Sequence, residues 1–197
     1  MKSKRIPLCL VFAISFLVLG HCGYSQDNLM TPSFLFEKFE LPKGHLGNSV
    51  QTMVQDTYGF MWFASKNGLH RWDGHQFKSY FHDPTNPNSL SANYIEHIYL
   101  ANDGTLWLSF GFDVKKEIID RFDIATETFS HFDYAPEIPN DQDAFVASIL
   151  EDNQGNIWVG THYGAYQLNI KTRKFKQYLH QPDNPTSLSH NFCRTVF

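Results

Sequence analysis

The stretch VQDTYGFMWFASKNGLHRWDGHQFKSY, which runs from Val54 to Tyr80, contains the pattern that decides the fold. Its core, DTYGFMW, returns as DNQGNIW at Asp152–Trp158, and a diverged copy, NDGTLW, lies at Asn102–Trp107. The tryptophans of the three copies are 45 and 51 residues apart. A period of this length is typical of propeller blades and other repeat arrays.

A second phrase is also repeated. HDPTNPNSLSANY spans His82–Tyr94, and HQPDNPTSLSHNF spans His180–Phe192, 98 residues later. Eight of the aligned positions are identical, which indicates duplication rather than shared composition.

Each repeat is expected to form four antiparallel strands, because short β-branched and aromatic runs alternate with turn signals. The expected strands are Val50–Gln55, Phe60–Ser65, Gly68–Trp72, Phe77–Phe81, Ile95–Leu100, Thr105–Phe110, Ile118–Phe122, Phe129–Phe132, Val146–Glu151, Asn156–Thr161, Gly164–Leu168 and Phe175–Tyr178. Four strands in about 45 residues make one propeller blade. The prediction is an all-β partial propeller with blades at 50–81, 95–132 and 146–178.

Residues that hold the same place in each repeat are interpreted as structural. They are Asp56, Gly59, Trp62, Gly104, Trp107, Asp152, Gly155 and Trp158. The aspartates and glycines suit tight turns, where a carboxylate bonds the backbone and glycine accepts positive φ. An indole buries about 150–250 Å², so each tryptophan is expected to pack between neighbouring blades. The middle repeat has Ala101 where the others have aspartate, which leaves its turn geometry open.

The two ends of the repeat region carry further expected strands. Phe34–Phe39 (FLFEKF) has the pattern of a fourth strand, so it is predicted to be a leading strand that completes another blade. Residues 193–197 (CRTVF) are predicted to begin a further blade. Three blades cannot close a ring of four to eight. The incomplete propeller at 34–197 is therefore expected to be part of a longer protein.

Residues 1–25 are predicted to be a signal peptide, with a basic start, an apolar run at Ile6–Leu19 and a cleavage site after Ser25. The expected location is therefore periplasmic or otherwise extracytoplasmic. The remaining segment has 13 Lys and Arg against 20 Asp and Glu, a net charge near −7. That balance argues against nucleic acid as the general partner. Only Cys193 remains of the three cysteines, so no intrachain disulfide is expected.

The D-x-x-G-x-x-W core at Asp56 and Asp152, together with the N-P-x-S-L-S connector, resembles the two-component regulator propeller repeat. That resemblance implies the extracytoplasmic sensor region of a hybrid histidine kinase of Bacteroidetes, which detects glycan fragments and signals to a kinase outside this sequence. It also implies an oligosaccharide or other small extracellular ligand, a homodimer through the longer protein, and membrane contact only through parts beyond this sequence.

No catalytic group, metal site or cofactor is predicted. His82 and His180 are repeat-equivalent and follow a fourth strand, so they are interpreted as connector residues, and no HExxH motif occurs. Two alternatives stay open. One is a secreted carbohydrate-binding or glycoside-processing propeller, although a glycosidase needs paired carboxylates about 5–9.5 Å apart. The other is a truncated, non-functional gene product.

The candidate binding face follows from strand direction. In an up-and-down blade, the loops between strands two and three and the connectors between blades emerge on the same side. Function concentrates in loops that a rigid scaffold carries. The predicted ligand-binding residues on this side are Lys66, Asn67, Lys115, Lys116, His162 and Tyr163.

Overall fold

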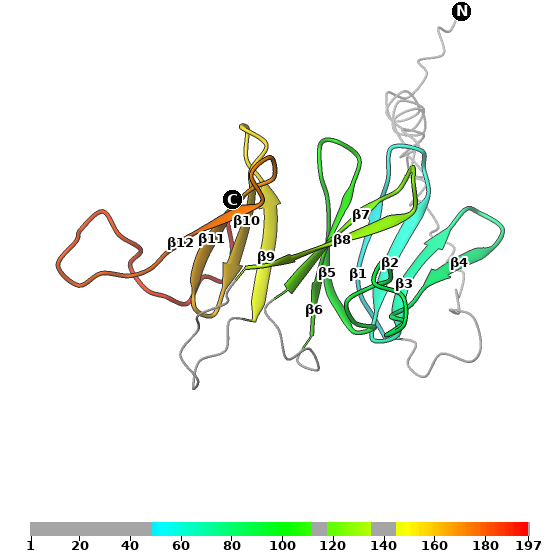
Figure 1. Ribbon diagram of the computed structural model, residues 1–197, viewed down its shortest axis with the longest axis horizontal. Helices are drawn as coiled ribbons and strands as arrows, with labels where there is room; N and C mark the ends of the chain where they lie inside the picture. Colours follow the sequence, from blue (N-terminus) through cyan, green and yellow to red (C-terminus); the bar gives the residue numbers. More distant parts are fainter. Residues whose placement is uncertain (1–48, 112–117, 135–144, 197) are drawn as a thin grey trace, which may run out of the picture. The chain divides into compact units, whose positions relative to one another are not determined.

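The computed structural model describes residues 49–111, 118–134 and 145–196, and their regular secondary structure consists of twelve β-strands (Figure 1). The strands form three four-stranded antiparallel sheets, each in chain order. No helix long and apolar enough to cross a membrane is found in this part of the chain. The all-β class and the blade architecture are therefore confirmed.

Each sheet is one of the expected blades. The first contains β1 (Val50–Gln55), β2 (Met61–Ser65), β3 (Gly68–Trp72) and β4 (Phe77–Tyr80). The second contains β5 (Ile95–Leu100), β6 (Leu106–Phe110), β7 (Ile118–Asp123) and β8 (Thr128–Asp133). The third contains β9 (Val146–Glu151), β10 (Ile157–Thr161), β11 (Gly164–Asn169) and β12 (Lys174–Tyr178). Every boundary lies within one residue of its predicted position.

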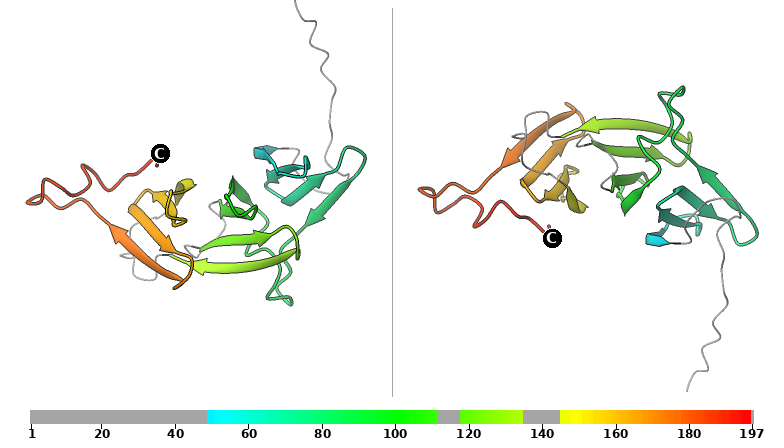
Figure 2. Two further views of the ribbon diagram at one scale, coloured as in Figure 1. Left: turned by 90° about the horizontal axis from the view of Figure 1, so that it is seen from above. Right: turned by 90° about the horizontal axis from the view of Figure 1, so that it is seen from below.

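The first strands of neighbouring sheets lie closest to one another. Strand β1 contacts β5, and β5 contacts β9, while the fourth strands lie at the opposite edges of their sheets (Figure 2). This is the arrangement of a propeller, whose innermost strands surround its axis. A loop that leads into a first strand therefore opens beside that axis.

Two hydrophobic clusters join the sheets. The first cluster packs Trp62 and Leu69 of the first sheet against Leu106, Leu108 and Phe122 of the second, and all five side chains are fully buried. The second cluster joins the second sheet to the third around Trp107, which is also fully buried. At these two positions the repeated tryptophan lies between two sheets. Trp158 is only partly buried, because none of the three sheets packs against its face.

The repeated aspartate closes the first turn of its blade and holds the tryptophan. The Asp56 carboxylate accepts bonds from the backbone N–H of Phe60 (3.0 Å) and from the Trp62 indole N–H (2.8 Å). Asp152 binds Trp158 in the same way, also at 2.8 Å.

The middle repeat keeps the turn although it lacks the aspartate. The Gly104 N–H donates to the Ala101 carbonyl at 2.9 Å, as Gly59 does to Asp56 at 3.1 Å. The missing aspartate affects the tryptophan rather than the turn. The buried Trp107 indole N–H has no acceptor among the described residues, because the carboxylate that serves Trp62 is missing here.

The expected start of a further blade at 193–197 forms no strand through residue 196. Its backbone is held by two bonds to the third sheet, Cys193 N–H to the Thr161 carbonyl (2.8 Å) and Val196 N–H to Ser148 Oγ (3.1 Å). These bonds place the segment beside the third sheet, but they do not form the regular backbone ladder of a strand. The predicted signal peptide (1–25) and leading strand (34–39) lie outside the described residues.

Candidate functional site

The β2–β3 and β10–β11 turns on the predicted binding face share one geometry. Ser65 Oγ accepts the Asn67 N–H (2.9 Å) and donates to the Gly68 carbonyl (3.2 Å). Thr161 makes the same two contacts in the third sheet. Gly68 has φ of +116°, and a Cβ there would lie 2.5 Å from the Tyr80 carbonyl oxygen. The turn is therefore fixed, and it presents the side chain of Lys66 to solvent.

At each of these turns, one side chain lies against an aromatic ring of the next blade's entry. Lys66 Nζ is 5.3 Å from the centre of the Tyr94 ring, a cation–π distance. The His162 ring is 4.5 Å from the ring of Phe192, centre to centre. Lys66 and His162 hold the same repeat position, as do Tyr94 and Phe192. We call these two pairs, Lys66–Tyr94 and His162–Phe192, the entry pairs.

A third aromatic residue, Phe145, precedes β9 and lies 5.5 Å from the His162 ring. The His162 N–H also donates to the Phe145 carbonyl at 3.1 Å. Tyr94, Phe145 and Phe192 each come directly before a first strand or its counterpart, and these strands are innermost. The entry pairs thus place aromatic faces and polar groups beside the propeller axis.

The long connectors that bear the repeated histidines are closed internally. His82 N–H donates to Asn93 Oδ1 (2.7 Å), and its Nδ1 lies 2.6 Å from the Leu90 carbonyl oxygen. His180 repeats both contacts with Asn191 and Leu188. Their observed role is to hold the connector, and no cluster of metal-ligating side chains occurs among the described residues.

The predicted binding residues are brought together only in part. Lys66 and Asn67 share one turn, and His162 and Tyr163 share its counterpart in the third sheet. Lys66 is exposed, whereas Tyr163 packs partly against the second hydrophobic cluster. Lys115 and Lys116 lie outside the described residues. The aromatic partners of the entry pairs were absent from the prediction, because they belong to the repeated connector phrase.

Sequence reasoning also missed a polar cluster that ties the first connector to the second sheet. Asp120, fully buried on β7, accepts bonds from the Ser91 N–H (2.8 Å) and hydroxyl (2.6 Å). His131 on β8 places Nδ1 2.7 Å from the same carboxylate and Nε2 2.8 Å from the Pro87 carbonyl oxygen. The only sequence signal was a carboxylate within the apolar run IIDRF.

The cluster favours a charged imidazole. The hydrogen bond to Asp120 raises the pKa of His131 above its usual 6.5, although partial burial opposes the shift. Both ring nitrogens face acceptors, which suits the protonated form. The arrangement is not that of a hydrolytic triad, because the serine and the carboxylate contact the same ring nitrogen and a backbone carbonyl occupies the other. Its observed role is to fasten the connector.

Two segments of the chain match a known repeat family. The two-component regulator propeller family matches residues 44–67 and 140–163. Each match contains the Asp–Gly–Trp turn and the loop that carries Lys66 or His162. These two segments are therefore similar to the two-component regulator propeller repeat.

Two known proteins share parts of this repeat region. Histidine kinase P4 of Formosa agariphila is 30% identical over 88 residues, which is 45% of this chain and 6% of that protein. The crystal structure of the extracellular domain of BT4673 from B. thetaiotaomicron aligns with a TM-score of 0.54 at 19% identity. The aligned part makes up 80% of this chain and 26% of that domain. This chain thus spans only a small part of the length of both relatives, and the second comparison supports the fold.

Proposed function

We propose that this chain is the ligand-sensing propeller region of an extracytoplasmic sensor whose kinase lies outside these residues. The family match carries the proposal, because it covers the first turn of the first and third blades and the loops that carry Lys66 and His162. The relative named as a histidine kinase is consistent with signalling by phosphotransfer in a longer protein. In such a protein, ligand binding acts by shifting a conformational equilibrium.

The proposed ligand is an oligosaccharide. The entry pairs expose aromatic faces beside polar side chains, and sugars bind to surfaces that combine stacking with hydrogen bonding. Phe192 is 41% exposed, so part of this residue is open to a ligand beside the His162 ring. Lys66 and His162 supply donors within reach of a sugar lying on those rings. The expected location, outside the cytoplasm, would bring the site to extracellular glycan fragments.

The test is a glycan-array screen of the purified chain, followed by calorimetry with the best oligosaccharide. Lys66→Ala and His162→Ala are expected to weaken binding about tenfold each, the cost of about 1.4 kcal/mol. Lys171→Ala is the matched control, because Lys171 is exposed in the β11–β12 turn on the opposite side of the third sheet. A chain that binds no glycan, or one whose affinity falls equally in the control, would refute the proposed site.

A further inference from the structure

Phe192, which ends the second copy of the repeated connector, is flanked by basic side chains. Its ring lies 4.5 Å from the His162 ring, with 39° between the two planes. The guanidinium carbon of Arg194 is 5.9 Å from the centre of the same ring. A third basic residue, His190, accepts the Phe192 N–H at Nδ1 (2.9 Å). We call Phe192, His162, His190 and Arg194 the Phe192 cluster.

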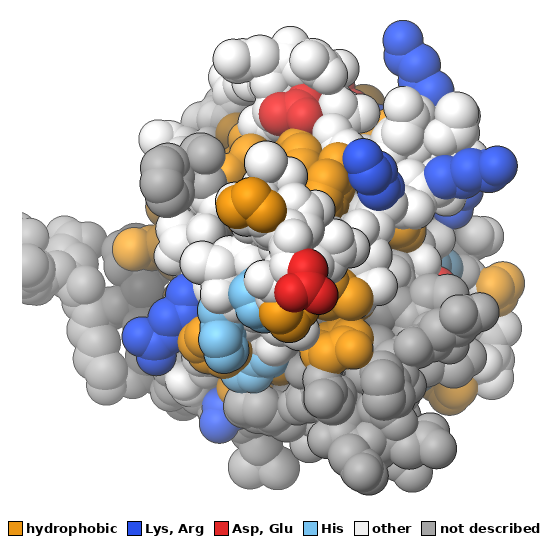
Figure 3. Space-filling view, turned by 90° about the vertical axis from the view of Figure 1, so that its left-hand side faces the viewer, with side chains coloured by type: hydrophobic (Ala, Val, Ile, Leu, Met, Phe, Trp, Pro, Cys, Tyr) orange, Lys and Arg blue, Asp and Glu red, His pale blue; other side chains and the backbone are white. Residues whose placement is uncertain are grey.

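The cluster lies at the surface of the third sheet. Seen from the end of the described region that holds this sheet, histidine side chains gather beside hydrophobic ones (Figure 3). His190, Phe192 and Arg194 are exposed, and His162 is half-buried. A ligand can therefore reach the cluster from solvent.

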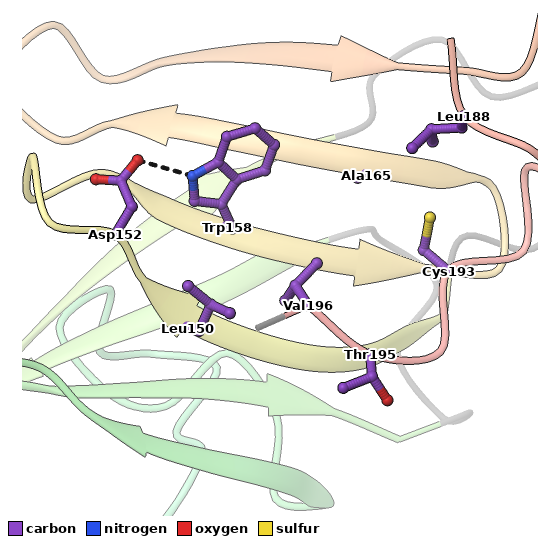
Figure 4. A pocket seen from close by; sticks show the side chains of 8 residues that line it. All are labelled: Leu150, Asp152, Trp158, Ala165, Leu188, Cys193, Thr195 and Val196. Atoms are coloured by element: carbon purple, nitrogen blue, oxygen red, sulfur yellow. Dashed lines mark hydrogen bonds between the residues drawn. The ribbon is translucent and has the colours of Figure 1, made fainter. Parts of the chain in front are cut away.

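The segment that carries Arg194 is held on the third sheet. The Cys193 N–H donates to the Thr161 carbonyl at 2.8 Å. Cys193 and Val196 also help to line an apolar pocket of about 370 Å³ beside Trp158 (Figure 4). Arg194 does not line this pocket, although both of its flanking segments are anchored there. The backbone therefore fixes the point from which the Arg194 side chain extends.

The polar atoms of the cluster are open to a ligand. Neither ring nitrogen of His162 bonds to another residue that the structure describes, and Arg194 forms no ion pair within the described ranges. Because His190 accepts a hydrogen bond at Nδ1, its Nε2 carries the ring proton and is a donor. The cluster thus offers N–H donors from three side chains around one exposed aromatic residue.

The first copy of the connector lacks this basic character. The offset of 98 residues pairs Phe192 with Tyr94, His190 with Ala92 and Arg194 with Glu96. A carboxylate thus takes the place of the guanidinium beside the first entry pair. No Asp or Glu occurs from residue 184 to residue 197, although the whole chain has a net charge of −4. The repeat itself therefore does not require the basic side chains at Phe192.

The chemistry of the cluster fits an anionic group attached to a sugar. A guanidinium forms paired, charge-assisted hydrogen bonds to carboxylates and to tetrahedral oxyanions. An exposed aromatic side chain offers an apolar face to a sugar ring, while nearby polar groups fix its orientation. A neutral sugar would use the aromatic ring and leave the charge of Arg194 without a partner.

We propose that the Phe192 cluster binds the acidic group of an oligosaccharide that carries carboxylate or sulfate. This proposal rests on the function proposed above and narrows its ligand from any oligosaccharide to an acidic one. It also assigns binding roles to His190 and Arg194, which the sequence did not single out.

The experiment measures binding to the purified chain by calorimetry with three tetrasaccharides. Tetragalacturonate carries carboxylates, its methyl ester has the same sugars without charge, and a carrageenan tetrasaccharide carries sulfate alone. At least one acidic tetrasaccharide is expected to bind at least about tenfold more tightly than the ester. The two acidic ligands distinguish carboxylate from sulfate.

The variants then locate the effect. Arg194→Gln is expected to weaken acidic binding about tenfold and to leave binding of the ester unchanged. Arg194→Lys keeps the charge but loses the paired geometry, so it should weaken acidic binding by only about threefold. Lys171→Gln is the matched control, because it removes one exposed positive charge from the opposite side of the third sheet and should change neither affinity. Circular dichroism of each variant checks that it folds.

Equal affinities for the acidic tetrasaccharides and the ester would overturn this inference and leave the proposed sensing of oligosaccharides standing. A chain that binds no glycan at all would refute both. Acidic binding that survives Arg194→Gln, or that falls equally in Lys171→Gln, would place the anion elsewhere and overturn the assignment to the Phe192 cluster.

Discussion

At the scale of single residues, the difference between the repeats lies in one hydrogen bond. Trp62 and Trp107 are both fully buried between sheets. The indole N–H of Trp62 binds Asp56, while that of Trp107 has no acceptor among the described residues. An unpaired buried donor costs about 1–3 kcal/mol. Ala101, in place of the aspartate, therefore costs the middle repeat a hydrogen bond to its indole and leaves the turn geometry intact.

This difference predicts unequal costs for the same substitution. Trp62→Phe removes a bonded indole and leaves the Asp56 carboxylate with one donor fewer, whereas Trp107→Phe removes a donor that was unpaired. We expect Trp62→Phe to lower the free energy of unfolding by about 1–3 kcal/mol more than Trp107→Phe does. Urea unfolding measures both values. Equal losses would show that the Asp56 bond contributes nothing to stability.

At the scale of elements, the first connector is tied to the second sheet by a bond that depends on pH. The pKa of His131 is raised in the folded chain, mainly by its bond to Asp120. A raised pKa means that the stabilisation is complete below the unfolded value of about 6.5 and is lost as the pH rises through the folded value. The connector should therefore be held less firmly in alkaline solution. The charge of Arg173, which donates a hydrogen bond to the His131 backbone carbonyl at 3.0 Å, lowers the pKa of the imidazole.

We predict that His131→Asn changes the pH dependence of stability. The unfolding free energy of the native chain should fall relative to the variant as the pH rises from below about 6.5 through the raised folded pKa of His131. Taking the difference removes the contribution of His97, whose pKa is lowered by burial and which acts in the opposite direction. Thermal unfolding across this range provides the measurement. Parallel curves for the two proteins would contradict the assigned role of His131.

The elements also show what the sequence could predict. Strand boundaries were predicted to within one residue because turn residues mark them locally, as Gly59 and Gly155 do with positive φ. The hydrogen bonds among Ser91, Asp120 and His131 join three separate segments. A local sequence pattern such as IIDRF therefore could not predict them. Residues 193–196 have strand-forming composition, yet a ladder requires a neighbour that composition does not reveal. The predicted loops held Lys66 and His162, but their ring partners came from another part of the repeat.

At the scale of the whole described region, the three sheets are unequally covered. The second sheet has both faces buried, one in each hydrophobic cluster, and every residue of β6 is buried. The third sheet has one face open at the apolar pocket beside Trp158, Leu150 and Ala165. In repeat architectures, stability follows the number of interfaces that a repeat makes with its neighbours. The second sheet should therefore be the last to open.

Native-state hydrogen exchange tests this order. We expect amides of β6 to exchange at least about tenfold more slowly than paired amides of β11, because opening β6 breaks two packed interfaces and opening β11 breaks one. The two strands make a matched comparison, since each lies inside its own sheet with a hydrogen-bonded neighbour on both sides. Equal protection would mean that the region unfolds as one unit, with the interfaces adding no local stability.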